Sequence, residues 1–237
     1  MSKIASPFSI YHITGKVYLF LFEEMYDLCM HFLRYQEFYE SPEFGGKSFT
    51  IIEFMEWYSK AFGGGSFTYS KDWAGFNIPS NVIWQVHTKI IPDRNKYDIA
   101  MLDAYNKISA NTHLIENCAK HDDFYILGAY KDDIKVLGHE LAHGLYATDA
   151  KYHTEMSALY KALPTNIVNS IFDYLIKIGY NKQVLADELQ AYMATGVPGD
   201  LQKANKQIQK LAIPFEKVFK KHTRNIKFDL SKPLSLQ

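Results

Sequence analysis

The sequence predicts an α+β fold that is mostly helical and contains a small sheet. Apolar side chains recur at helical spacing over most of the 237 residues, whereas only the stretches 66–70 and 124–130 are typical of strands. A hydrophobic fraction of 47% is sufficient for a core of this size. We therefore expect a helical N-terminal half, residues 1–120, and a second half, residues 121–237, that together form one compact unit.

Three helices are expected in the first half, over residues 20–39, from Thr50 to about residue 62, and over residues 94–120. The second begins with a capping box, because Glu53 follows Thr50 at the required spacing. Residues 63–92 are irregular and rich in aromatic side chains, with one short strand at 66–70. These aromatic side chains either fill a small core or line a substrate groove.

The second half begins with the clearest strand of the chain, residues 124–130. Helices are expected after it over residues 133–146, 154–163, 165–178, 183–195, 201–211 and 214–221, and a polar coil is expected after His222. Pro164 is typical of the start of the helix at 165–178, and Gly179 and Gly196 are typical of helix ends.

Charge and cysteine content exclude several classes of protein. Lys and Arg number 26, as do Asp and Glu, so the formal net charge is zero and nothing favours nucleic acid as a partner. Cys29 and Cys118 are the only cysteines, which are too few for a disulfide-stabilised secreted domain. Both lie in apolar, helix-like surroundings, so we expect buried thiols.

Targeting signals are not evident in the sequence. The apolar run at residues 16–22 ends at two glutamates and has no small-residue cleavage site after it, so it is not typical of a signal peptide. No stretch approaches the roughly 20 apolar residues of a membrane span. The sequence therefore predicts a cytoplasmic protein, and export by a route that reads no N-terminal signal remains an alternative.

The segment His139-Glu140-Leu141-Ala142-His143 is the strongest indication of function. It reads H-E-x-x-H inside a segment with helical spacing, and side chains four residues apart lie on the same helical face. Two imidazoles on one face can bind one divalent metal ion, and zinc is the ion that this motif favours. Glu140 lies about 100° around the helix, where it can reach a metal-activated water as general base.

A catalytic zinc site needs a third protein ligand. Glu188 is the favoured candidate, because it lies in an amphipathic segment that can pack against the motif helix and direct its carboxylate toward the metal. Asp149, His153 and Glu155 remain alternatives, and the two latter residues could instead orient a metal-binding histidine. The neighbouring Asp187 is expected either to support the ligands or to face solvent.

With this motif and third ligand, residues 124–196 resemble a gluzincin-type zinc peptidase. The order is a strand, a helix with H-E-x-x-H, further helices and a later helix with a glutamate. The long gap between His143 and Glu188 is most similar to that in the peptidase domain of anthrax lethal factor and similar toxins. The resemblance implies a zincin-like catalytic half with a bound zinc ion, and a peptide or protein substrate. Residues 1–120 match no family.

The resemblance also implies a tyrosine that stabilises the oxyanion of the tetrahedral intermediate. Tyr180, just before the helix with Glu188, takes this role by analogy, and Tyr146 and Tyr192 are the alternatives. Two other functions remain open: a zinc hydrolase that acts on a bond other than a peptide bond, and a binding module that keeps the fold without catalysis. An intact Glu140 favours catalysis over mere binding.

Overall fold

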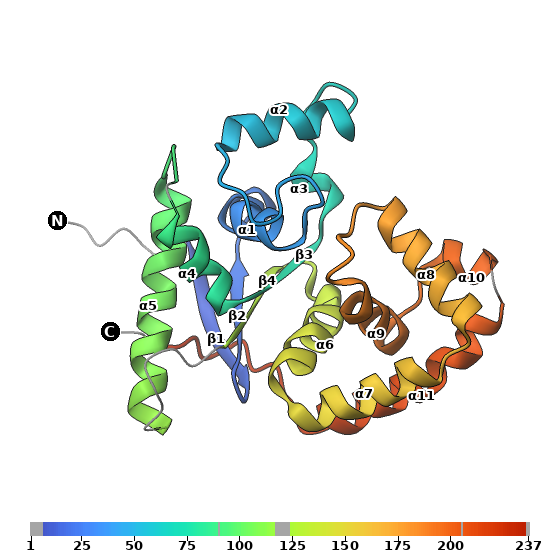
Figure 1. Ribbon diagram of the computed structural model, residues 1–237. Helices are drawn as coiled ribbons and strands as arrows, with labels where there is room; N and C mark the ends of the chain where they lie inside the picture. Colours follow the sequence, from blue (N-terminus) through green and yellow to red (C-terminus); the bar gives the residue numbers. More distant parts are fainter. Residues whose placement is uncertain (1–6, 90, 117–123, 205, 236–237) are drawn as a thin grey trace.

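The computed structural model describes residues 7–89, 91–116, 124–204 and 206–235 (Figure 1). Four strands and eleven α-helices occur in these residues. In chain order they are β1 Phe8–Thr14, β2 Val17–Phe22, α1 Met25–Glu40, α2 Ile51–Ala61, α3 Tyr69–Asp72, β3 Gly75–Pro79, α4 Ser80–Thr88, α5 Lys96–Glu116, β4 Tyr125–Tyr130, α6 Leu137–Thr148, α7 Ala150–Ala162, α8 Thr165–Lys177, α9 Leu185–Thr195, α10 Gly199–Ala204 and α11 Gln207–Thr223.

The four strands form one mixed sheet in the order β1-β2-β4-β3. β1 and β2 are an antiparallel hairpin, whose turn uses Gly15 at a positive φ of 49°. β4 lies between β2, to which it is parallel, and β3, to which it is antiparallel. Because β4 is covered on both faces, its side chains are buried from Tyr125 through Ala129, and this explains its continuous apolar sequence.

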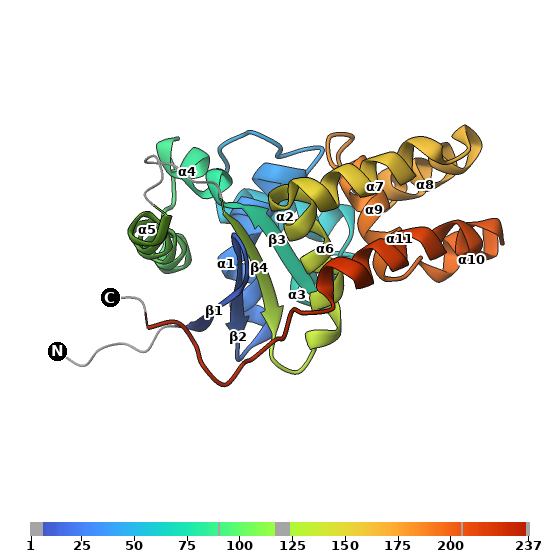
Figure 2. The same ribbon diagram turned by 90° about the horizontal axis from the view of Figure 1, so that it is seen from below.

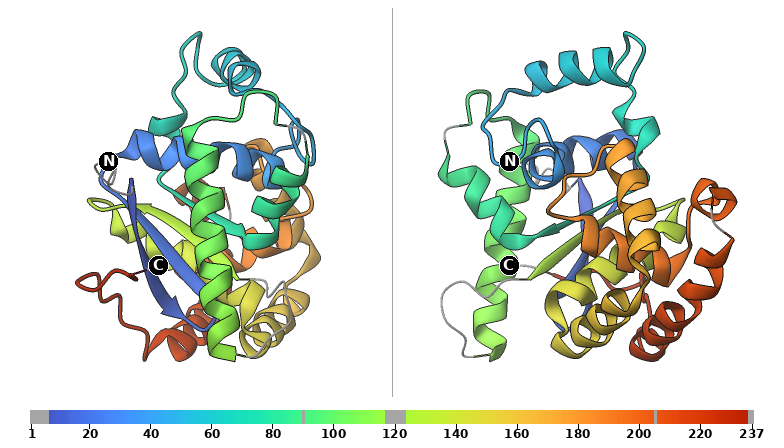
Figure 3. Two further views of the ribbon diagram at one scale, coloured as in Figure 1. Left: turned by 90° about the vertical axis from the view of Figure 1, so that its left-hand side faces the viewer. Right: turned by 45° about the vertical axis from the view of Figure 1, so that its right-hand side comes forward.

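Helices cover both faces of the sheet, and each face has its own hydrophobic core (Figures 2 and 3). On one face Phe20 and Phe76 pack with residues of α1, α4 and α5. On the other face Leu19 and Leu127 pack with residues of α6, α7, α8, α9 and α11. β2 alternates between the two cores, with Phe20 and Phe22 in the first and Val17 and Leu19 in the second.

The structure confirms the α+β class and most of the predicted helices. The capping box at Thr50 and Glu53 is present at the start of α2. The predicted helices at 165–178 and 183–195 correspond to α8 and α9, and residues 224–235 are coil apart from turns. Cys29 is a buried free thiol as expected, whereas Cys118 and the end of the predicted helix 94–120 lie outside the described residues.

Other predicted elements were wrong. The stretch 66–70 is not a strand but leads into α3, and the strand of this segment is β3, Gly75–Pro79. Residues 17–22, partly assigned to a helix that started at residue 20, form β2, and β1 was not expected. The first half is therefore not simply helical, because it provides three of the four described strands.

In the second half, α7 begins four residues earlier than the helix predicted at 154–163, directly after Asp149. The helices predicted at 201–211 and 214–221 are instead α10 and the longer α11, which continues through Pro214. Among the residues that the structure describes, no helix combines the length and hydropathy needed to cross a bilayer.

Candidate metal centre

The H-E-x-x-H segment lies on α6, as the sequence predicts. β4 ends at Tyr130, a single 3₁₀ turn follows at Ile134–Val136, and α6 then runs from Leu137 to Thr148. α6 packs against the sheet on one side and against α9 on the other (Figure 1). Glu188 lies in the first turn of α9, so the contact between these two helices brings its carboxylate to the histidine pair.

His139, His143 and Glu188 converge. Each offers one atom that could bind a metal ion, and these atoms lie within 4.8 Å of one another; no other such group occurs in the described part of the chain. The two Nε2 atoms are 3.3 Å apart. Oε2 of Glu188 lies 3.6 Å from Nε2 of His139, and Oε1 lies 3.5 Å from Nε2 of His143. Side chains of His143 and Glu188 are almost fully buried, whereas His139 is 19% exposed.

Neighbouring groups contact the Nδ1 atom of both imidazoles. Nδ1 of His139 lies 3.2 Å from the hydroxyl of Thr195, which donates its own proton to the carbonyl of Ala191 at 2.7 Å. The hydroxyl therefore accepts from Nδ1. Nδ1 of His143 lies 3.0 Å from a carboxylate oxygen of Asp187, which can only accept. With these contacts at Nδ1, each ring directs its Nε2 atom toward the carboxylate of Glu188.

The cluster brings imidazole nitrogens and a carboxylate close together in a buried site. Oε2 of Glu188 is inaccessible to solvent and has no hydrogen-bond partner among the described residues. Two imidazole lone pairs and a carboxylate repel one another unless a proton or a cation lies between them. Burial disfavours the charged imidazolium, but the carboxylates of Asp187 and Glu188 outweigh it and raise the pKa of His143 well above its usual value. The donor set fits a bound cation.

Glu140 lies beside this cluster and is held by residues of the sheet. Its Oε2 accepts a hydrogen bond of 2.8 Å from Nδ2 of Asn77 on β3, and Oδ1 of Asn77 accepts one of 2.6 Å from the hydroxyl of Tyr125 on β4. Burial raises the pKa of Glu140, while His139, His143 and Asn77 oppose the shift. The carboxylate therefore has a fixed orientation and a raised proton affinity, which suit a general base.

Because Gly75 on β3 has no side chain, there is space beside it for the carboxylate of Glu140. A Cβ atom at this position would lie 2.7 Å from Oε1 of Glu140 and 2.7 Å from Cγ2 of Val136. Any side chain here would collide with the carboxylate or displace it. Gly75 and Asn77 therefore allow the side chain of Glu140 to pack against β3.

Two of the three candidate tyrosines line the cavity in front of the cluster. This cavity has a volume of about 590 Å³, and its lining includes His139, Glu140 and Glu188 together with Tyr180 and Tyr192. The hydroxyls of the two tyrosines are 3.5 Å apart. Burial and the nearby Glu188 carboxylate raise the pKa of both phenols, so both remain protonated donors at neutral pH.

The third candidate, Tyr146, belongs to a different environment. Its hydroxyl lies 3.1 Å from Oγ of Ser157, and its ring stacks on His153 at a centroid distance of 4.2 Å. Tyr146 is not among the residues that line the cavity. Tyr180 and Tyr192 are therefore the hydroxyl donors that the structure places at the cluster.

The alternative third ligands interact elsewhere. Asp149 accepts hydrogen bonds from the backbone of Lys151 and Tyr152 and caps α7. His153 contacts the carbonyl of Tyr146 through Nδ1 at 2.9 Å, and Glu155 forms an ion pair of 2.7 Å with Lys221. Of the four carboxylates and imidazoles considered as the third ligand, only Glu188 belongs to the cluster.

Sequence reasoning missed the residues that support the site from other parts of the chain. Asn77, Gly75 and Tyr125 reach Glu140 through the sheet, and Thr195 reaches His139 from the end of α9. Of the supporting residues that were considered, Asp187 lies at His143, whereas His153 and Glu155 interact elsewhere. Nothing in the local sequence distinguishes Asn77 from a loop asparagine, because its role depends on the pairing of β3 with β4.

A comparison of the chain with known proteins finds no matching family model, curated protein or solved structure. The interpretation of this site therefore depends on its residues and their geometry.

Proposed function

We propose that this protein is a zinc-dependent metallopeptidase, with His139, His143 and Glu188 as the metal ligands and Glu140 as the general base. The observation that carries the proposal is the convergence of two Nε2 atoms and the Glu188 carboxylate directly beside a glutamate held by Asn77. These are the residue types of a catalytic zinc site that leaves a fourth position for water.

The separation of the two histidine nitrogens is compatible with zinc. Ligands at neighbouring corners of a tetrahedron lie about 3.3 Å apart when each metal–nitrogen bond is about 2.0–2.1 Å. The two Nε2 atoms are 3.3 Å apart, and each faces its own oxygen of Glu188, Nε2 of His143 at 3.5 Å from Oε1 and Nε2 of His139 at 3.6 Å from Oε2. Neutral imidazoles with a carboxylate are also a donor set that suits zinc.

Each residue has a role in this proposal. When bound, zinc supplies Lewis acidity, which lowers the pKa of water to about 7. Oε2 of Glu140 is occupied by Asn77, so Oε1 is the oxygen that accepts the proton of the attacking water. Glu140 then returns this proton to the leaving amine. The hydroxyl of Tyr180 or Tyr192 donates a hydrogen bond to the developing oxyanion.

The position of β3 supports a peptide as substrate. β3 is at the edge of the four-stranded sheet, and Ala74, Gly75 and Asn77 line the same cavity as Glu140. An extended peptide laid along such an edge can add to the sheet through backbone hydrogen bonds. This would bring a peptide bond past Glu140 and the ligand cluster.

Metal content tests the site directly. We expect about one zinc per chain by elemental analysis of the purified protein, and a large loss in His139→Ala and Glu188→Ala. His153→Ala is the matched control, because this histidine stacks on Tyr146 and should leave the zinc content unchanged. Equal, substoichiometric zinc in the wild type and in His139→Ala would disprove the metal site.

Turnover tests the reaction. A broad peptide library incubated with the zinc-loaded protein should be cleaved, and a chelator should abolish cleavage. Glu140→Gln should retain zinc and lose activity by at least about a hundredfold, since general base catalysis contributes that much. A protein that binds zinc but cleaves no peptide would favour the non-catalytic or non-peptide alternatives.

A further inference from the structure

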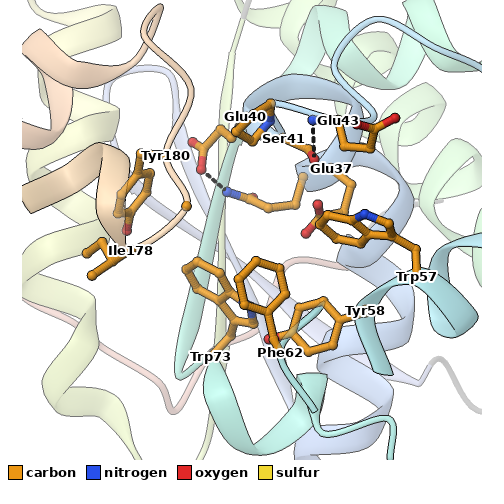
Figure 4. Close-up of a pocket in the computed structure, with 13 residues that line it drawn as sticks. Glu37, Glu40, Ser41, Glu43, Trp57, Tyr58, Phe62, Trp73, Ile178 and Tyr180 are labelled. Atoms are coloured by element: carbon orange, nitrogen blue, oxygen red, sulfur yellow. Dashed lines mark hydrogen bonds between the residues drawn. The ribbon is translucent and has the colours of Figure 1, made fainter. Parts of the chain in front are cut away.

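A second cavity, with a volume of about 350 Å³, adjoins the cleft in front of the metal centre (Figure 4). Residues of α1, α2 and the loop between α8 and α9 surround it. Glu40, Trp73 and Tyr180 line both this cavity and the cleft, so a ligand that occupies one can extend into the other. We refer to it as the α1 cavity.

One wall of the α1 cavity is acidic. Glu37, Glu40 and Glu43 of α1 and the following turn line it, and no lysine, arginine or histidine is among its lining residues. Glu37 and Glu40 are buried. Their observed hydrogen bonds come from neutral groups, the hydroxyl of Tyr69 to Glu37 and the amide of Gln36 to Glu40. Glu43, at the rim, lies 3.4 Å from Lys47.

A buried acceptor in the same wall lacks a partner. Gln36 is only 8% exposed, and its amide nitrogen donates to Glu40 at 2.6 Å. Its Oε1 is inaccessible to solvent and accepts no hydrogen bond from the described residues. An unsatisfied buried acceptor costs free energy, and because Gln36 lines the cavity, a small rotation of its amide toward a ligand donor would remove that cost.

The opposite wall is aromatic. Figure 4 shows Tyr58, Phe62 and Trp73 across the cavity from the glutamates of α1, with Trp57 at the side. Aromatic faces attract cations through the ring quadrupole, and they also cover the alkyl stem of a long side chain. An apolar occupant would cover the rings but leave Oε1 of Gln36 without a donor and the carboxyl groups of Glu37 and Glu40 without a cation.

We propose that the α1 cavity is a specificity subsite that binds a lysine or arginine side chain of the peptide in the adjoining cleft. The inference builds on the proposed peptidase function, because it assigns the side chain next to the cleaved bond. The ammonium or guanidinium group donates to the acceptors of α1, and the alkyl stem lies against the rings of Trp73 and Phe62.

Tryptophan signals allow a direct binding test that does not depend on zinc or turnover. The chain has three tryptophans, of which Trp57 and Trp73 line the α1 cavity. Trp84 lies on α4, is 49% exposed and is not part of the lining, so it is an internal control. With 5-fluorotryptophan incorporated, ¹⁹F NMR titrations would use Nα-acetyl-lysine amide, Nα-acetyl-arginine amide and the neutral Nα-acetyl-norleucine amide.

We expect the basic amides to shift the Trp57 and Trp73 signals saturably and to leave the Trp84 signal in place. The norleucine amide should bind about tenfold more weakly, as should the lysine amide to Glu37→Gln, since a hydrogen bond to a charged group is lost. Glu56→Gln removes a carboxylate of α2 that faces a different hollow and should bind like the wild type. Equal binding of the lysine and norleucine amides, or unchanged binding in Glu37→Gln, would overturn the proposal.

Cleavage preferences separate the two proposals. If the zinc-loaded protein cleaves peptides, lysine or arginine should be enriched at one position beside the cleaved bond, and Glu37→Gln should remove that enrichment while cleavage continues. Cleavage without any basic preference would refute the subsite and leave the peptidase intact. Selective binding of the lysine amide without any peptide cleavage would support a cation-binding cavity and refute the peptidase.

Discussion

Gly75 is the residue whose substitution most directly tests the role of Glu140. In Gly75→Ala the new Cβ would lie 2.7 Å from Oε1 of Glu140, so the carboxylate must move away from the position that Asn77 fixes. Small displacements of a general base reduce turnover strongly. We expect a loss of about tenfold or more in kcat with an unchanged zinc content.

The matched control is Gly199→Ala, because a Cβ at Gly199 meets no atom within 4 Å. Turnover and zinc content measured together distinguish the outcomes. If Gly75→Ala keeps wild-type kcat, Oε1 of Glu140 is not the atom that accepts the proton.

Glu37 should make stability depend on pH. Burial raises the pKa of its carboxyl from 4.5 to about 7, although hydrogen bonds from Tyr69 and Ser41 oppose the shift. Between these two pH values the folded state holds a proton that the unfolded state has released, so stability falls as pH rises through the folded pKa. In Glu37→Gln this loss should disappear, an effect on the order of 3 kcal/mol.

Urea unfolding of the wild type and of Glu37→Gln at pH 5 and pH 8 measures the difference. The variant should gain stability relative to the wild type at pH 8 and much less at pH 5. A constant difference between the two proteins at both pH values would show that Glu37 titrates normally in the folded state.

At the residue scale, the sequence predicted the residues that share one helix better than those that meet across the fold. His139 and His143 converge because a helix repeats every 3.6 residues, and Glu140 follows from the same geometry. Glu188 was reached through the amphipathic pattern of its segment. Asn77 could not be predicted, because its contact with Glu140 depends on strand pairing between distant residues.

Among the helices, α7 depends on a single side chain at its start. Asp149 accepts from the backbone nitrogens of Lys151 and Tyr152, which have no partner within the helix. Asp149→Ala should lower the free energy of unfolding by about 1 kcal/mol, the usual contribution of an N-cap. Asp149→Asn keeps an acceptor and should cost much less.

Thermal or urea unfolding of both variants checks this prediction. Zinc content should remain at the wild-type level in each, because Asp149 lies outside the ligand cluster. If Asp149→Ala lost zinc while its free energy of unfolding stayed the same, Asp149 would again be a candidate metal ligand.

The strands were harder to predict than the helices for a physical reason. β2 contributes side chains to both cores, so its sequence shows a continuous apolar run with no polar alternation. Such a run has the same appearance as the first turn of a buried helix. β3 has only five residues and contains glycine and proline, which local propensity assigns to loops. Its strand conformation comes from pairing with β4.

For the whole molecule, the sheet joins the two halves of the sequence. β4, from the second half, lies between β2 and β3, both from the first half. The candidate metal centre has the same composite origin, since its ligands lie on α6 and α9 while Asn77 and Gly75, which position Glu140, lie on β3. The three candidate ligands therefore lie within the second half, whereas the position of the proposed general base depends on contacts between the halves.

This connectivity predicts that neither half folds alone. A fragment of residues 121–237 would expose both edges of β4, together with the side chains that pack against β2, such as Leu127 and Leu141. We expect the fragment to show poorly dispersed amide signals by NMR and no stoichiometric zinc. Co-expression with residues 1–120 should restore dispersion and zinc binding, because β4 then regains both neighbours. A fragment 121–237 that gives a dispersed spectrum and binds one zinc by itself would instead show that the second half is an autonomous metal-binding domain and that the mixed sheet is dispensable for it.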